Sequence, residues 1–171
     1  MKVNRNSEPA KPAWNANDPM GSFRLCGEYL HQKAIQIFLK DQNHAEMMFI
    51  FKSNGECFVK LVRGDRDDFV ASLRELIKDS SIIGVVHVAE AWTRFGGQGD
   101  HVTTQLIHGE MAVSDLKPED RGEALFVGMQ SRDGHTLTWV VPIIRDGSGK
   151  ATLGEGFTIN EIGGRYAGLF R

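Results

Sequence analysis

The chain has 171 residues and a formal net charge of −2, with basic and acidic residues interspersed along its length. This balance argues against a nucleic-acid-binding protein, because a surface dedicated to nucleic acids needs a basic patch. No apolar run approaches the roughly 18 residues of a membrane helix, and the first residues lack the apolar core of a signal peptide.

The first segment in chain order, residues 1–21, is expected to be a flexible tail. It holds three of the five prolines of the chain among alanine, asparagine and lysine, and such a composition cannot fill a core. A single folded domain is expected over residues 22–171. Trp14 stands out in the tail, because an isolated tryptophan can dock on the protein body or on a partner.

Two helices are predicted from capping residues and apolar spacing. Ser22 can cap a helix over residues 23–40, in which apolar residues recur on one side at helical spacing. Asp65 can cap a second helix over residues 66–78, because the acidic residues that follow favour the positive end of the helix dipole. Each helix therefore presents one apolar stripe that can pack on a sheet.

Asn54-Gly55 predicts a β-hairpin over residues 46–63. An Asn-Gly pair between two apolar runs is typical of a two-residue type I′ turn, in which both central residues need a positive φ. This turn sets the register and places Phe51 opposite Phe58. Both faces of this hairpin are largely apolar.

Asp133-Gly134 predicts a second two-residue hairpin, over Glu123–Arg145, by the same argument. In that register Gly128 lies opposite Trp139 and leaves room for the indole. Apolar residues again occupy both faces, so we expect two covers, such as a helix on one side and a second helix or a partner subunit on the other. Pro142 has no N–H for a ladder, which indicates an edge strand or the end of a strand.

The residues between and after the hairpins complete the predicted sheet. Residues 82–92 are dense in β-branched side chains and predict a central strand. A connection over residues 93–122 follows, and connections of this length are usually functional or disordered. A short strand is expected over residues 151–157. The elements predict an α+β fold in the order α-β-β-α-β-loop-β-β, with helices packed on a mostly antiparallel sheet of about five strands.

Glu90 and His87, on the predicted central strand, are the candidate catalytic residues. An acidic residue in an apolar strand can be a general base whose pKa burial has raised. The alternative is a structural partner for an arginine such as Arg94, Arg121 or Arg165. His87 could move a proton, although a hydrogen-bonded structural histidine is commoner. Alternation along the strand places Glu90 and His87 on opposite faces, so they cannot form a simple pair.

His101, His108 and Glu110 come nearest to a metal-binding cluster. On a helix the two histidines would lie about 10 Å apart along the axis, which is too far for one ion without a bend. The His-Gly-Glu order is similar to the H-x-E of zinc deaminases, but the P-C-x-x-C that those enzymes need is absent. We therefore predict no metal and no cofactor. The predicted binding residues are polar or aromatic side chains of the loops and the tail: Trp14, Trp92, Phe95, His101, His108 and Glu110.

The two cysteines, Cys26 and Cys57, lie far apart and form no CxxC pair. Reduced cysteines and a cytoplasmic location are expected, with a single disulfide as the alternative. Both side chains then serve as small apolar residues.

The leading functional hypothesis is a non-catalytic binding or adaptor protein that acts through protein–protein contacts. No G-x-S-x-G or H-E-x-x-H motif occurs, whereas residues 93–122 and the terminal segments offer contact surfaces. The alternative is a small hydrolase or ligand-binding enzyme with Glu90 in a loop-covered pocket. Because two helices are few for two apolar faces, a homodimer or a stable protein partner is also expected, without a nucleic acid or a membrane.

Overall fold

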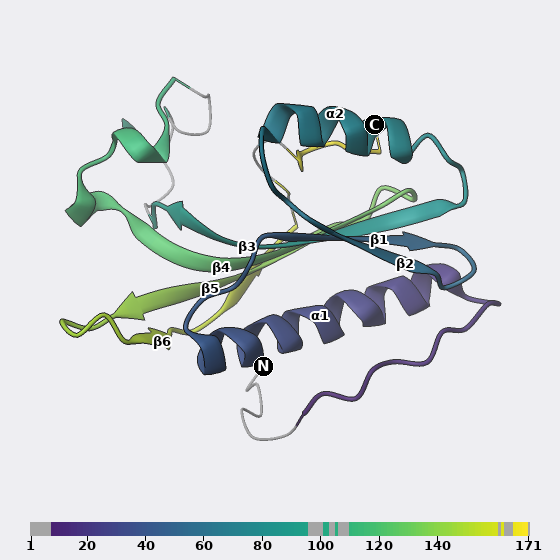
Figure 1. The fold of residues 1–171 in the computed structure, drawn as a ribbon, viewed down its shortest axis with the longest axis horizontal. Coiled ribbons are helices and arrows are strands. Elements are labelled where there is room, and N and C mark those ends of the chain that lie inside the picture. The colour runs from purple at the N-terminus through teal and green to yellow at the C-terminus, as the bar shows by residue number, and fades with distance from the viewer. Residues whose placement is uncertain are drawn as a thin grey trace.

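The computed structural model describes residues 8–95, 101–102, 105, 110–160, 162 and 166–170. Over these residues the chain forms three layers, because one helix packs on each face of an antiparallel sheet (Figure 1). Helix α1 (Pro19–Asp41) covers one face, and helix α2 (Arg66–Leu76) covers part of the other. This architecture confirms the α+β class. Within the described residues, no helix is long and apolar enough to cross a membrane.

Seven strands make up the described sheet. They are β1 (Met47–Lys52), β2 (Cys57–Leu61), β3 (Ile82–Thr93), β4 (Gly122–Ser131), β5 (Thr136–Arg145), β6 (Ala151–Leu153) and β7 (Phe157–Ile159). Their spatial order is β2-β1-β3-β4-β5-β6, and β7 also pairs with β5. Two short 3₁₀ helices, Val113–Asp115 and Pro118–Asp120, precede β4. The predicted central strand, β3, therefore joins the two hairpins.

Helix α1 starts at Pro19 rather than at residue 23. Asp18 is its N-cap, because the Asp18 carboxylate accepts a hydrogen bond of 2.9 Å from the Gly21 N–H. Proline is well suited to the first turn, where its missing N–H would be unpaired in any case. The predicted cap, Ser22, instead donates its hydroxyl to the Asp18 carbonyl one turn back. Helix α2 begins as predicted after its cap, Asp65, whose carboxylate accepts hydrogen bonds from the N–H groups of Asp67 and Asp68.

Both predicted hairpins form, but their turns differ from the predicted type. A type I′ turn needs a positive φ at both central residues. In the structure φ is positive at Gly55 (90°) and Gly134 (86°), but not at Asn54 or Asp133. Each turn instead spans residues 53–55 or 132–134, with the glycine at its end in the left-handed region. The side chains of Asn54 and Asp133 each accept a hydrogen bond from the N–H two residues on, which stabilises this longer loop.

The extra residue in each loop shifts both registers by one, so the predicted pairs are wrong. Phe51 pairs with Cys57 and not with Phe58. In the second hairpin, Gly128 pairs with Thr138, and Trp139 pairs with Val127. Directly opposed residues share a face. A shift of one residue therefore changes which side chains of β2 share a face with a given side chain of β1, and the same holds for β4 and β5.

The face toward α1 holds the larger core. Gly27 and Gly84 are the points of closest approach between α1 and the sheet: a Cβ on Gly84 would lie 2.4 Å from the Phe23 ring, and one on Gly27 would lie 2.6 Å from the Met129 sulfur. The helix glycine therefore has a packing reason despite its low helix propensity. The residues buried here include Phe23, Cys26, Ala34, Ile35, Phe38, Val86, Val88, Leu125, Val127, Met129, Val141 and Ile143.

The opposite face has a smaller core under α2 and the C-terminal segment. It draws on β1 and β3, and its buried residues are Met48, Ile50, Leu73, Ile77, Ile82, Val85, Tyr166 and Leu169. The two helices thus supply the two covers that the apolar faces demand. A partner subunit is not required for covering β1 and β3.

Pro142 lies inside β5, which continues to Arg145, so it neither ends the strand nor marks an outer edge. Its carbonyl accepts a hydrogen bond of 2.8 Å from the Gly154 N–H, on the side of β5 that faces β6 and β7. In an antiparallel ladder the N and C=O of one residue point to the same side. The missing N–H therefore falls where the ladder of β5 breaks between two short strands, and its absence costs little.

The left-handed glycine of the second hairpin gives a direct test of the loop type. A Cβ added at Gly134 meets no described atom within 4 Å, so the cost of Gly134→Ala is conformational. We expect the free energy of unfolding, measured by urea denaturation, to fall by about 1 kcal/mol. Gly147→Ala is the matched control, because that site is equally open and lacks a positive φ. An equal loss in both variants would contradict this loop assignment.

Candidate functional site

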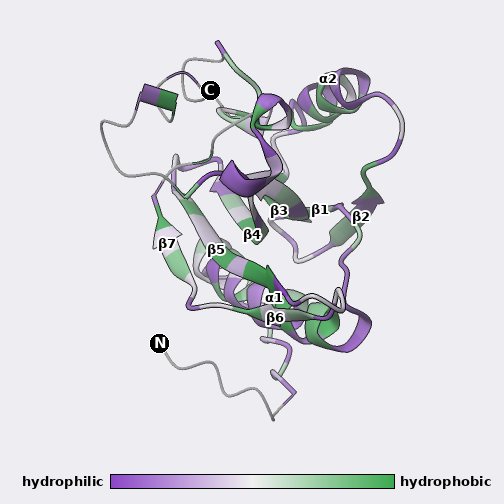
Figure 2. Ribbon diagram, turned by 90° about the vertical axis from the view of Figure 1, so that its left-hand side faces the viewer, coloured by the Kyte–Doolittle hydropathy of each residue, from purple (hydrophilic) through white to green (hydrophobic). Residues whose placement is uncertain are grey.

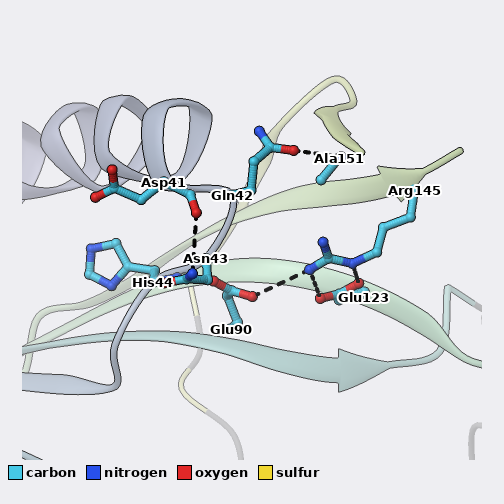
Figure 3. Close-up of polar contacts among 8 residues, drawn as sticks. All are labelled: Asp41, Gln42, Asn43, His44, Glu90, Glu123, Arg145 and Ala151. Carbon is cyan, nitrogen blue, oxygen red and sulfur yellow. Dashed lines mark hydrogen bonds and ion pairs between the residues drawn. The ribbon is translucent and has the colours of Figure 1, made fainter. Parts of the chain in front are cut away.

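Glu90 lies in a network of charged and polar groups near the C-terminal end of α1 (Figure 3). The backbone N–H of His44 donates a hydrogen bond to one Glu90 oxygen, and the other oxygen lies 3.7 Å from Arg145 Nη2. Arg145 also donates two hydrogen bonds to the Glu123 carboxylate, from Nη2 at 2.6 Å and from Nε at 2.7 Å. One guanidinium thus bridges two carboxylates on neighbouring strands.

The environment of Glu90 shifts its pKa in two directions. Burial raises the pKa of Glu90, and the nearby Glu123 carboxylate raises it further, while the His44 N–H and Arg145 act against them. The net direction is upward. An N–H donor and a cation thus engage both oxygens, which offsets the cost of burying the carboxylate. Its arginine partner is Arg145, which lies outside the set of arginines considered from the sequence.

His87 belongs to a second network, on the opposite face of the sheet. Its Nε2 lies 3.0 Å from a Glu46 oxygen, and Arg66 at the start of α2 approaches the other oxygen at 2.6 Å. The Tyr166 ring packs on the imidazole with a centroid distance of 4.4 Å. Burial alone would raise the pKa of Glu46, but the hydrogen bonds from His87 and Arg66 outweigh it and lower the pKa to about 2. This network ties β1, β3, α2 and the C-terminal segment together.

The two candidate catalytic residues therefore do not meet. Glu90 on β3 pairs with Leu125 on β4, which belongs to the core under α1. His87 instead contacts the Tyr166 ring, which belongs to the core under α2. Their predicted separation onto opposite faces is confirmed. No group of three or more metal-binding side chains lies together in the part of the chain that the structure describes.

The predicted binding residues fall into different places. Trp14 docks on the protein body: its ring stacks on Phe51 at 6.3 Å, and its Nε1–H donates to the Ser53 carbonyl at 3.2 Å. Trp92 stays open to solvent, with 59% of its surface exposed. It lies opposite Glu123 and shares a face with Glu90. His101 and Glu110 are exposed, and His108 lies outside the described residues.

Strand β7 lies beside β5, at the side of the sheet opposite β2 (Figure 2). Phe95 belongs to a row of exposed apolar side chains at this side. The row, here called the β7 strip, consists of Phe95, Ile144, Phe157 and Ile159, exposed by 50%, 57%, 45% and 43%. Phe157 pairs with Val140 and Ile159 with Thr138, which places both side chains on the face away from α1. The rings of Phe95 and Phe157 meet edge to face at 6.4 Å.

Helix α2 does not cover the β7 strip, because the core under α2 is formed with β1 and β3 and not with β5 or β7. Sequence reasoning found Phe95 but missed the other three residues. Phe157 and Ile159 lie in β7, a strand of only three residues, which is too short to show a periodic pattern. Alternation within β5 could have found Ile144, because it shares a face with the buried Val140 yet lies past the end of the core.

Two shallow, open hollows flank α2, and neither includes Glu90 or His87. The larger, of about 550 Å³, lies between α2 and the end of β2 and includes Leu61 and Phe69. The smaller, of about 460 Å³, lies between α2 and the C-terminal segment and includes Arg132 and Phe170. A loop-covered catalytic pocket around Glu90 is therefore not among these hollows.

His31 on α1 is a partly buried histidine that sequence reasoning did not single out. Its ring stacks on Trp139 at 5.1 Å, and its Nε2 has no hydrogen-bond partner among the described residues. Burial lowers the pKa of His31 from 6.5 to about 4. The neutral ring is thus favoured by folding, and this contribution to stability is present above pH 6.5 and lost as the pH falls toward 4.

His31→Phe should remove this pH dependence, because phenylalanine keeps a ring on Trp139 and does not titrate. In the unmodified chain we expect the free energy of unfolding to fall by about 2 to 3 kcal/mol between pH 6.5 and pH 4 from His31 alone. Denaturation at a series of pH values measures the slope. His135→Gln, beside the second hairpin turn, is the control and should keep the slope. Equal slopes for the unmodified chain and His31→Phe would contradict the assignment.

Comparison with known proteins gives no relative from which a function could be inferred. No family model, curated protein or solved structure matches the chain. The contacts and exposed surfaces of the chain itself must therefore support any assignment of function.

Proposed function

We propose that the chain is a non-catalytic binding or adaptor protein that holds a protein partner on the β7 strip. The observation that carries this proposal is the exposure of four large apolar side chains in one row at one side of the sheet. Scattered apolar residues are normal on protein surfaces, but a contiguous exposed group is typical of an interaction site. The connection over residues 93–122, which includes Phe95, supplies neighbouring contacts in this proposal.

The chemistry of the strip suits a protein partner. Aromatic residues are enriched at the centres of protein interfaces, because they bury a large area at a small entropic cost. Phe95 and Phe157 already pack edge to face, so part of the aromatic contact surface is formed before binding. The partner in this proposal presents an apolar surface of its own, with polar groups around its rim.

A small hydrolase or ligand-binding enzyme centred on Glu90 is the second candidate. Its support is the raised pKa of Glu90 and the exposed Trp92 two residues further along the same face. Against it stand the His44 N–H and Arg145, which already satisfy the carboxylate. The two hypotheses separate by substitution, because Glu90→Gln would abolish turnover in an enzyme and leave partner capture by the β7 strip intact.

Phe157→Glu tests the binding hypothesis. The side chain is 45% exposed, so the fold should survive while a charge enters the strip. We expect a partner that the unmodified chain captures from its native cell to be lost by Phe157→Glu, by at least about tenfold in recovered amount, as measured by quantitative mass spectrometry.

Leu25→Glu is the matched control for this experiment. Leu25 is 52% exposed on α1, so the control makes the same kind of change far from the strip and should capture the partner as well as the unmodified chain does. The binding hypothesis fails if Phe157→Glu recovers the same proteins in the same amounts.

A further inference from the structure

We propose that β2 is a self-assembly edge, where two copies of this chain join antiparallel β2 strands with Val59 on the two-fold axis. The two sheets would then form one continuous sheet across the dimer. This surface is at the opposite edge of the sheet from the β7 strip, so the inference does not rest on the function proposed above.

The first support is the exposure of β2. It is the first strand of the sheet order, and within the described chain it pairs with β1 alone. All five of its residues are exposed, and three of them are large apolar residues: Phe58 (43%), Val59 (54%) and Leu61 (44%). Such a row of apolar side chains next to unpaired backbone groups is a template for another strand.

The outer edge of β2 presents regularly spaced backbone N–H and C=O groups to an incoming strand. The Glu56 carbonyl accepts from the Lys52 N–H, and the Val62 N–H donates to the Glu46 carbonyl, so the even-numbered residues turn toward β1. Alternation in an antiparallel ladder turns the N–H and C=O groups of the odd-numbered residues to the outside. The outward residues are Cys57, Val59 and Leu61.

The usual protection of an edge strand is weak here. Natural edges carry proline, several charges or a bulge that blocks further pairing. β2 has no proline and one charged residue, Lys60, and its register with β1 runs from Leu61 to Cys57 without a shift. Nothing within the strand therefore prevents a second strand from continuing the ladder.

A second copy fits this edge because the strand is complementary to itself. With Val59 opposite Val59 of the partner subunit, Cys57 lies opposite Leu61 of the partner subunit, and all three outward residues form hydrogen-bonded pairs. Their side chains share one face, so the apolar group of one copy packs on the same group of the other. A two-fold axis perpendicular to the sheet produces this arrangement.

Charges on the other face of β2 favour the same register. Phe58 comes to lie opposite Lys60 of the partner subunit, a cation–π pairing that the ring already makes with Lys52 at 5.0 Å. Glu56 is then a diagonal neighbour of the same partner lysine, with opposite charge. Moving the axis by one residue would instead set Lys60 against Lys60 of the partner subunit, which is unfavourable.

Val59→Lys tests the interface in the full chain. It sets two lysines against each other on the axis, so the dimer that the unmodified chain forms at tens of micromolar should dissociate about tenfold or more readily in light scattering coupled to size exclusion. Leu25→Lys, on α1, should keep the dimer, and so should Phe157→Glu on the β7 strip. Thermal denaturation confirms that each variant is folded. A monomeric unmodified chain at every concentration, or an unaffected Val59→Lys dimer, overturns the proposal.

Cysteine cross-linking checks the register independently. Cys26 is buried and Cys57 is free and exposed, so Cys57→Ser provides the background. Directly opposed residues in a hydrogen-bonded pair have Cα atoms about 5.5 Å apart, within the range of a disulfide. Val59→Cys should therefore form a disulfide-linked dimer under mild oxidation, and Phe58→Cys should form one at least about tenfold more slowly. Faster linkage at position 58 would overturn the register.

Discussion

A glycine in the left-handed conformation closes each long hairpin of this protein, and the arrangement of side chains across the sheet depends on it. Gly55 and Gly134 each end a loop one residue longer than a type I′ turn. That residue decides which side chains of neighbouring strands share a face. The left-handed glycine recurs in the turn between β5 and β6, where Gly149 has a φ of 83°. The three hairpins thus obey one local rule.

The ion network around Glu90 follows from this register. Glu123 pairs with Ile143, so Arg145, two residues further along β5, lies on the same face as Glu123. With a two-residue turn the pairing would shift by one, and Arg145 would lie on the opposite face from Glu123. The two hydrogen bonds between them, and the bridge to Glu90, could then not form.

The two polar networks explain why charged residues occur in apolar strands. On the face under α2, Glu46 pairs with His87 and Arg66, while Glu90 on the other face pairs with Arg145. A buried carboxylate is costly unless it is paired or hydrogen-bonded. Each network also joins segments distant in the chain, since Arg66 opens α2 and Arg145 ends β5. The carboxylates thereby help to hold the helices and strands in place.

The sequence was enough to predict the class of fold, the run of elements, the cap of α2 and the separation of His87 from Glu90. Each of these depends on a periodicity or on a local preference. The register could not be predicted, because an Asn-Gly or Asp-Gly pair suits both a two-residue turn and the end of a longer loop. The pairing of Arg145 with Glu90 was missed because the correct register is needed to place both residues on one face. The contact also crosses an intervening strand, which no local pattern reveals. Phe157 and Ile159 of the β7 strip were missed because their strand is only three residues long.

The two free surfaces of the sheet lie at its opposite edges, and this has a consequence for how a β2-linked pair would bind. A two-fold axis perpendicular to a sheet leaves each face on its own side, so both β7 strips would face the same way, one at each outer end of a doubled sheet. A ligand with two matching sites, or a filament with a regular repeat, could then be held at both ends at once. The second attachment would be intramolecular, so the effective concentration at the second site would raise the overall affinity even if each single contact is weak.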